Sequence, residues 1–189
     1  MRSVSSHKNL EHTIQYFFNI FPPRGADSIL DIGSGVSVPY KGYLQTRCRI
    51  YKSLDIRPSK KVDFCLDLIE GTHFKDKEWD WTWCSETLEH IPQKHMKTFV
   101  DEVCRISMNI VWTFPLPYLP SFNDDKGHRK VIVDMKSYEK EFKVFDRTTR
   151  NGRGIWIFGR KDRKITVDKK GIHQEGYSPD NLTRMKSIF

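Results

Sequence analysis

The strongest constraint on the fold is the stretch SILDIGSGVS at residues 28–37, where a short apolar run leads directly into two glycines. Ile29 and Ile32 favour a β-strand, because β-branched side chains pack well on a pleated surface. Gly33 and Gly35 can adopt positive φ and let a ligand approach the backbone closely. The stretch therefore predicts a strand that ends in a ligand-binding loop, and a nucleotide-like ligand is the first candidate.

The rest of the chain alternates between segments typical of strands and of helices. Strands are expected at 28–32, 49–56, 62–68, 80–84 and 109–114. Helices are expected within 1–25 and at 39–46, 92–107 and 134–142. Two further β-prone runs within 143–161 are joined across RNGRG, which is typical of a hairpin turn. This order predicts an α/β fold, a Rossmann-like doubly wound and mostly parallel sheet with a C-terminal antiparallel hairpin.

The size and composition of the chain fit one compact domain. It has 189 residues, of which 38% are hydrophobic and 13% aromatic, so a packed core can form. We expect the domain to span residues 1–162, with an N-terminal helix region at 1–25 and a basic C-terminal tail at 163–189. The sequence does not indicate an oligomeric state.

Several features predict a cytoplasmic protein without membrane contact. No apolar run approaches the ~20 residues of a membrane-spanning helix, and the start MRSVSSHKNLEH is too polar for a secretory signal. The four cysteines include no CxxC pair, which argues against a zinc site and fits reduced thiols. No metal ion is therefore expected.

The positive charge is concentrated in part of the chain. The net charge is +8, and residues 160–189 contain eight Lys and Arg against four Asp and Glu. Such a tail can contact nucleic acid, although charge runs are commonly only solvated surface. We expect weak RNA or DNA binding by the tail, without sequence preference.

Three aspartates follow predicted strands at the edge where open α/β sheets bind ligands: Asp31, Asp55 and Asp67. Asp55 lies 20 residues after Gly35, a position from which a carboxylate on the neighbouring strand can accept both hydroxyls of a ribose. A dinucleotide is less well supported, because the GxGxxG pattern needs a third glycine where this chain has Val38. These residues predict a nucleoside pocket.

Four segments together resemble the class I S-adenosylmethionine-dependent methyltransferases. In chain order, they are LDIGSG, SLDI, LDL and WCSETLEHIP, similar to the family's first, second, third and post-strand-four motifs. The resemblance covers roughly residues 26–117. It implies that residues 1–162 form a methyltransferase domain and that the cofactor is S-adenosyl-L-methionine.

The resemblance implies a role for each matching residue. Gly33 and Gly35 would border the methionine part of the cofactor, and Asp31 would orient its ammonium group. Asp55 would hold the ribose hydroxyls. The family often has a further glycine two places after the second one, where this chain has Ser37.

The later motifs imply the adenine site and the methyl-transfer site. Asp67 would accept from the adenine amino group, and Leu68 would supply a backbone amide and apolar contact. Ser85 and Glu86 would line the wall near the donor methyl.

Methyl transfer needs few catalytic groups. Because a sulfonium methyl is already activated, alignment of nucleophile, methyl and sulfur matters most. A general base helps only if the acceptor carries a proton, and the candidates are Glu86, His90 and His128.

The sequence favours a small-molecule acceptor or a metabolite-linked group such as a sugar. The main alternative is a nucleic-acid methyltransferase, which the basic tail favours. Amino-directed enzymes of that kind show Asn/Asp-Pro-Pro-aromatic where this chain has SETL, and the Pro-Cys of cytosine-C5 enzymes is also absent. Further alternatives are an NAD-dependent oxidoreductase and a non-catalytic cofactor-binding module.

Overall fold

The structure is a computed structural model that describes residues 26–115, 133–150, 153–161, 165–168 and 171–174. The helix predicted within residues 1–25 and the candidate base His128 lie outside these ranges.

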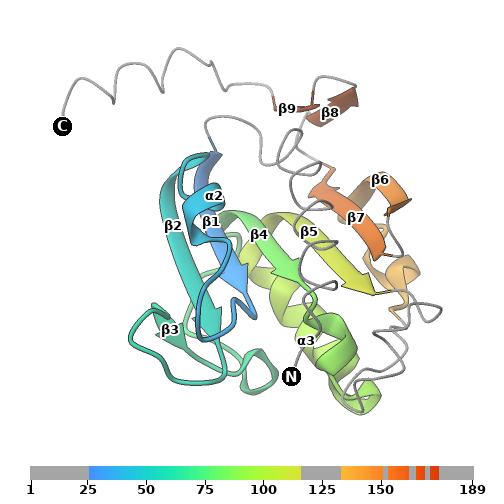
Figure 1. Cartoon of the computed structure of the whole chain (residues 1–189). Coiled ribbons are helices and arrows are strands. Elements are labelled where there is room, and N and C mark those ends of the chain that lie inside the picture. Colours follow the sequence, from blue (N-terminus) through green and yellow to red (C-terminus); the bar gives the residue numbers. More distant parts are fainter. Residues whose placement is uncertain (1–25, 116–132, 151–152, 162–164, 169–170, 175–189) are drawn as a thin grey trace.

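The described residues form one seven-stranded sheet with the order β3-β2-β1-β4-β5-β7-β6 (Figure 1). The five parallel strands are β1 (Ala26–Ile32), β2 (Cys48–Asp55), β3 (Phe64–Cys65), β4 (Trp79–Ser85) and β5 (Ser107–Pro115). The antiparallel strands β7 (Arg153–Arg160) and β6 (Phe142–Arg150) complete the sheet beside β5. This confirms the predicted doubly wound sheet with its C-terminal antiparallel pair.

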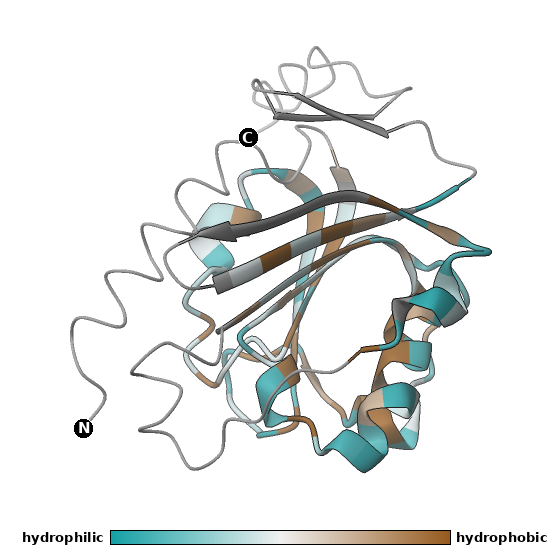
Figure 2. Ribbon diagram, turned by 90° about the vertical axis from the view of Figure 1, so that its right-hand side faces the viewer, coloured by the Kyte–Doolittle hydropathy of each residue, from teal (hydrophilic) through white to brown (hydrophobic). Residues whose placement is uncertain are grey.

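The helices are shorter than predicted, apart from α3. Helix α3 (Gln93–Ile106) has the expected length and buries one apolar face, and Figure 2 shows hydrophilic and hydrophobic residues alternating around it. Helix α2 (Lys41–Leu44) is a single turn with Gly42, a weak helix former, inside it. The predicted helix at 134–142 is only the 3₁₀ turn η3 (Met135–Tyr138), because Phe142 is buried and pairs with β7 as the start of β6.

Strand β3 is also shorter than the predicted 62–68, because side chains take over the hydrogen bonds of the strand ladder. The Asp63 carboxylate accepts from the Ser53 backbone N–H at 2.9 Å and from the Ser53 hydroxyl at 2.8 Å. Asp67 then starts the 3₁₀ turn η1 (Leu68–Glu70) by accepting from the Ile69 N–H. The edge of β2 is therefore paired with β3 only at its end.

Apolar side chains cover both faces of the sheet, as a doubly wound fold requires. Leu30 and Ile32 of β1 belong to the cluster that includes the buried face of α3, whereas Ile29 packs on the opposite face with Trp81 and Trp83 of β4. This alternation fixes which side chains of β1 and β2 lie on each face.

Part of the predicted basic tail forms two short strands. Strands β8 (Ile165–Asp168) and β9 (Gly171–Gln174) make a separate antiparallel pair, for which the sequence analysis made no prediction. Within the ranges described, no helix is both long enough and apolar enough to cross a lipid bilayer.

Candidate cofactor site

The candidate site lies at the carboxyl end of β1, where a tight loop leads towards α2. The loop is held by two backbone hydrogen bonds, from the Ser34 N–H to the Leu54 carbonyl at 3.0 Å and from the Val38 N–H to the Gly35 carbonyl at 3.1 Å. Gly33 has φ 68° and Gly35 has φ 70°, in the left-handed region that favours glycine. The loop predicted from the glycines is therefore present.

The two glycines are needed for different reasons. A Cβ at Gly33 would lie 2.2 Å from the Thr87 hydroxyl oxygen, so the loop after β4 packs directly against it. A Cβ at Gly35 would meet no heavy atom within 4 Å among the described residues. Glycine is therefore needed at position 33 so that Thr87 can pack against the loop, whereas Gly35 borders open space in which a ligand can approach the backbone.

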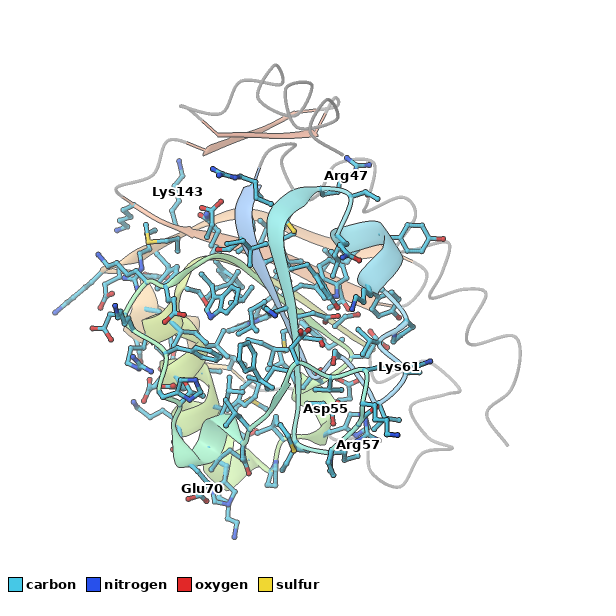
Figure 3. All side chains as sticks on the ribbon, turned by 90° about the vertical axis from the view of Figure 1, so that its left-hand side faces the viewer. Arg47, Asp55, Arg57, Lys61, Glu70 and Lys143 are labelled. Carbon is cyan, nitrogen blue, oxygen red and sulfur yellow. The ribbon has the colours of Figure 1, made fainter. Side chains whose placement is uncertain are left out.

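Asp55 at the end of β2 is the centre of the site. Its carboxylate accepts from the Gly35 N–H at 2.8 Å and from the Arg57 N–H at 2.9 Å. The Arg57 guanidinium adds two bonds, from Nε at 3.0 Å and from Nη2 at 3.3 Å. Figure 3 labels this pair at the end of β2. Asp55 thus ties the glycine loop to β2, whereas its predicted contact with ribose hydroxyls stays a prediction.

The environment of Asp55 keeps it ionised at neutral pH. Burial raises the pKa of the carboxyl, but the hydrogen bonds from Arg57 and Gly35 and the charge of Arg57 outweigh that effect and hold the pKa below its ordinary value. An ionised carboxylate next to open space can accept hydroxyl groups from a ligand.

Asp31 is buried, with only 1% of its surface exposed, and the Tyr51 hydroxyl donates to its carboxylate at 2.7 Å. Burial, aided by the charge of Asp55 and opposed by the Tyr51 hydrogen bond, raises the pKa of Asp31 to about 7. Its predicted role beside the cofactor ammonium stays a prediction.

Asp67 and Leu68 follow β3, at the same edge of the sheet. Asp67 accepts from the Ile69 N–H at 2.9 Å through one carboxylate oxygen, and Leu68 is buried. The adenine contacts predicted for both residues stay predictions.

The ends of β4 and β5 are joined by a chain of side-chain hydrogen bonds. The hydroxyls of Ser85 and Thr113 are 2.7 Å apart, and the Thr113 hydroxyl donates to Glu86 Oε1 at 3.4 Å. The Glu86 N–H donates to the Thr113 carbonyl at 2.8 Å, and Glu86 has φ 52°, uncommon for a residue other than glycine. The structure thus brings Ser85 and Glu86 together, whereas His90 is exposed in the 3₁₀ turn η2 (Leu88–His90).

The sequence analysis missed four residues of this region: Tyr51, Arg57, Thr87 and Thr113. Arg57 carried a usable signal, because the second residue after an aspartate often donates its backbone N–H to that carboxylate. The partner of Asp31 comes from β2 and that of Gly33 from the loop after β4, and only the pairing of the strands brings them together.

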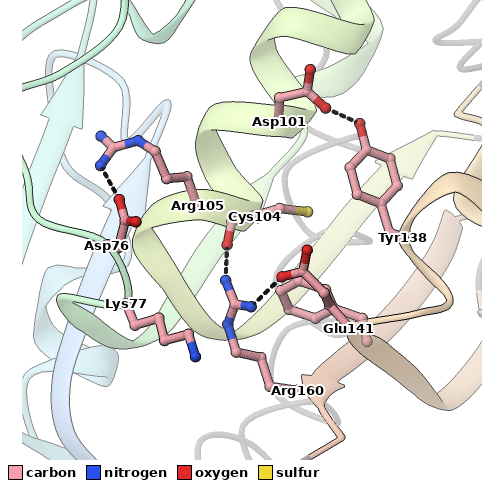
Figure 4. Close-up of a pocket in the computed structure, with 9 residues that line it drawn as sticks. Asp76, Lys77, Asp101, Cys104, Arg105, Tyr138, Glu141 and Arg160 are labelled. Carbon is pink, nitrogen blue, oxygen red and sulfur yellow. Dashed lines mark hydrogen bonds and ion pairs between the residues drawn. The ribbon is translucent and has the colours of Figure 1, made fainter.

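A cavity of about 310 Å³ lies at the opposite edge of the sheet, near the amino ends of β4 and β5 (Figure 4). In its wall, the Arg160 guanidinium donates to the Cys104 carbonyl at 2.6 Å, to the Ser107 carbonyl at 3.0 Å and to Glu141 at 2.5 Å. Arg160 therefore caps the carboxyl end of α3, which is a structural role away from the glycine loop.

Comparisons with known proteins identify the fold. No family profile and no curated protein sequence matches this chain. One similar solved structure is the N-methyltransferase NodS from Bradyrhizobium japonicum WM9 in complex with S-adenosyl-L-homocysteine. Its TM-score is 0.60 at 13% identity, and the match covers 81% of this chain and 87% of NodS. A SAM-dependent methyltransferase from Aquifex aeolicus has a TM-score of 0.55 at 11% identity, and the match covers 79% of this chain and 87% of that one.

A third similar structure is the small RNA methyltransferase HEN1, with a TM-score of 0.56 at 12% identity, covering 89% of this chain and 26% of that one. At these identities the likeness establishes the fold, which is that of SAM-dependent methyltransferases. The fold implied by the sequence motifs is therefore confirmed.

Proposed function

We propose that this chain is an S-adenosylmethionine-dependent methyltransferase whose cofactor binds at the carboxyl ends of β1 and β2. The observation that carries the proposal is the open space at Gly35 directly beside the carboxylate of Asp55, joined to it at 2.8 Å. A ligand can approach the backbone at Gly35, and the carboxylate would supply acceptors for its ribose hydroxyls once the Arg57 guanidinium moves away.

The residues of the site fit this cofactor in charge and shape. Asp55 would hold the ribose, Gly33 and Gly35 would border the methionine part, and Asp67 with Leu68 would contact the adenine. When bound, the cofactor supplies a methyl group on a positively charged sulfur. The carboxylates near the glycine loop complement that charge.

The chain's contribution to transfer would be mainly alignment of the acceptor with the methyl. Glu86 is the best-supported general base in the described part of the chain, because Thr113 holds its side chain and the backbone hydrogen bond to β5 holds its main chain. His90 and His128 remain the other proposed bases.

The acceptor class is open between two proposals. The preference for a small molecule or a sugar-linked group rests on the missing base-directed motifs. The nucleic-acid alternative is favoured by a feature of the surface that the sequence analysis overlooked, namely a row of cations along β2.

Ligand binding tests the proposed function. S-adenosyl-L-homocysteine should raise the melting temperature of the protein and NAD should not, since a ligand at a hundredfold excess over its Kd stabilises the folded state by ~2.7 kcal/mol. Asp55→Ala should abolish most of the shift, because each lost charge-assisted hydrogen bond is worth roughly 1.5–3 kcal/mol.

Asp63→Ala is the matched control. Asp63 is also bonded to a backbone N–H and paired with a cation, Lys52, but it lies on the β3 side of the sheet edge. Its variant should keep the full shift. Stabilisation by NAD, or equal shifts for the two variants, would overturn the proposal.

A further inference from the structure

The segment between residues 41 and 61 is the most basic stretch of the described chain. It contains seven Lys and Arg against one acidic residue, Asp55. We call the surface formed by these cations the β2 flank: Lys41, Arg47, Arg49, Lys52, Arg57, Lys60 and Lys61. The net charge of the whole chain is +8, so a large share of the excess positive charge lies in this segment.

The fold distributes these cations along the length of β2. They come from α2, from β2 and from the loop after β2, and Figure 3 shows Arg47 near the start of β2, Arg57 near its end and Lys61 between them. Strand β2 has 8 residues. At about 3.3 Å per residue, such a strand is roughly 26 Å long. The β2 flank is therefore an extended strip rather than a point-like anion site.

The same strip exposes apolar side chains. The exposed large hydrophobic residues of the described chain are Val36, Tyr43, Ile50 and Ile56, at 43%, 41%, 53% and 62% exposure. All four lie on the glycine loop, on α2, on β2 or directly after it. Apolar groups gathered among cations are typical of a surface that binds another molecule.

Part of this charge is not neutralised. Lys52 pairs with Asp63 at 3.1 Å and Arg57 pairs with Asp55 at 3.0 Å. Lys41, Lys60 and Lys61 are exposed and have no ion pair within the part of the chain that the structure describes. These three lysines therefore leave excess positive charge on α2 and on the loop after β2.

From this surface we infer that the β2 flank binds the phosphate backbone of a nucleic acid. A strip of roughly 26 Å matches about eight nucleotide steps at 3.4 Å per step along a strand. A small anion would engage one or two of the cations and leave the others without a role. Tyr43 supplies one exposed ring for base stacking.

The position of the strip connects it to the candidate cofactor site. The Ser59 hydroxyl donates to the Val36 carbonyl at 2.8 Å, so the loop that carries Lys60 and Lys61 is fastened to the glycine loop. A strand lying along β2 therefore reaches the edge of the sheet that carries the candidate cofactor site. That the bound nucleic acid is also the methyl acceptor rests on the proposed function.

The test compares two triple variants that remove the same charge. Lys41→Gln, Lys60→Gln and Lys61→Gln together change the β2 flank, whereas Lys94→Gln, Lys136→Gln and Lys140→Gln change exposed lysines of α3 and the region of η3. Fluorescence anisotropy of the full-length chain with a labelled single-stranded RNA, and with DNA of the same sequence, gives Kd across a salt series without cofactor.

We expect the flank variant to lower the slope of log affinity against log salt by roughly 2 to 3, since each neutralised phosphate contributes about 0.7–0.9. At about 0.1 M salt the affinity should fall by about 100-fold, while the control variant stays within about twofold of the unaltered chain. Ultraviolet cross-linking should attach the RNA to peptides from residues 36–61.

Other results would overturn the inference. They are equal losses in the two triple variants, cross-links confined to the tail, or flank-dependent binding to phosphatidylserine vesicles without binding to RNA or DNA. Titration with S-adenosyl-L-homocysteine separates this inference from the proposed function, because the flank variant should bind it normally. Failure of that ligand to bind the unaltered chain would refute the proposed function and leave the nucleic-acid surface standing.

Discussion

Replacing Arg57 by alanine should increase the affinity of the protein for S-adenosyl-L-homocysteine. A carboxylate has about four lone-pair sites, and Asp55 already accepts four hydrogen bonds. Two come from the backbone N–H groups of Gly35 and Arg57, and two come from the Arg57 guanidinium. Two ribose hydroxyls can therefore bind only by replacing the guanidinium, so that Arg57 competes with the ligand.

The expected gain is small, because the Arg57 side of the competing ion pair is exposed to solvent. The Arg57 side chain is 62% exposed, whereas that of Asp55 is 4% exposed. Exposed ion pairs contribute about 0–1 kcal/mol after screening by water. Removal of the guanidinium should therefore tighten binding by up to about fivefold, and high salt should reduce the difference because it screens the pair.

Isothermal titration calorimetry of Arg57→Ala is the assay. S-adenosyl-L-homocysteine is the appropriate ligand, because its sulfur is neutral and a change in the charge of the protein affects it less than a sulfonium. Lys52→Ala is the matched control, since Lys52 forms a similar ion pair with Asp63. Unchanged or weaker binding by Arg57→Ala would refute the competition and mean that the ribose does not replace the guanidinium.

Three further variants test the surroundings of the site. Asp31→Asn should remove a pH-dependent loss of stability. The pKa of Asp31 is about 7 in the folded protein and about 3.9 in the unfolded chain. Its contribution to the free energy of unfolding is therefore complete below about pH 4 and is lost as the pH rises to about 7. Urea unfolding across this range should show the Asp31→Asn variant gaining stability relative to the unaltered chain as the pH rises, and parallel curves would contradict the burial argument. Gly33→Ala should destabilise the fold by more than the ~1–2 kcal/mol that a left-handed conformation costs a residue with a side chain, because the new Cβ also meets Thr87. Gly35→Ala should cost only that ~1–2 kcal/mol and should impair ligand binding. Equal unfolding midpoints for the two variants would contradict this distinction. Arg160→Met should lower the free energy of unfolding by about 2–4 kcal/mol, since two carbonyls at the end of α3 lose their donor. Calorimetry should find the affinity for S-adenosyl-L-homocysteine unchanged. A loss of affinity would mean that this edge of the sheet influences the candidate cofactor site.

The sheet could be predicted from the sequence because its strands carry local signals. Each parallel strand has its own apolar run, and the glycine loop marks where β1 ends. The limits of β3 could not be predicted, because Asp63 bonds to Ser53 of the neighbouring strand, and that contact depends on the sheet register.

The part of the site that could be predicted consists of residues with a recognisable spacing in the sequence. The spacing from Gly35 to Asp55 marked both residues as neighbours of one ligand, and the structure places the Gly35 N–H 2.8 Å from the Asp55 carboxylate, while the ribose contact stays a prediction. The burial of Asp31 against Tyr51 was not predictable, since strands β1 and β2 must pair before the two side chains meet. The β2 flank was overlooked because its cations are interleaved with apolar residues along the chain rather than clustered in one run.

The most direct test of the central claim is a crystal structure of the chain with S-adenosyl-L-homocysteine. We predict the nucleoside over Gly35, with both ribose hydroxyls within hydrogen-bond distance of the Asp55 carboxylate and the Arg57 guanidinium moved away from it. A ligand bound elsewhere, or a ribose that makes no contact with Asp55, would contradict the proposed site.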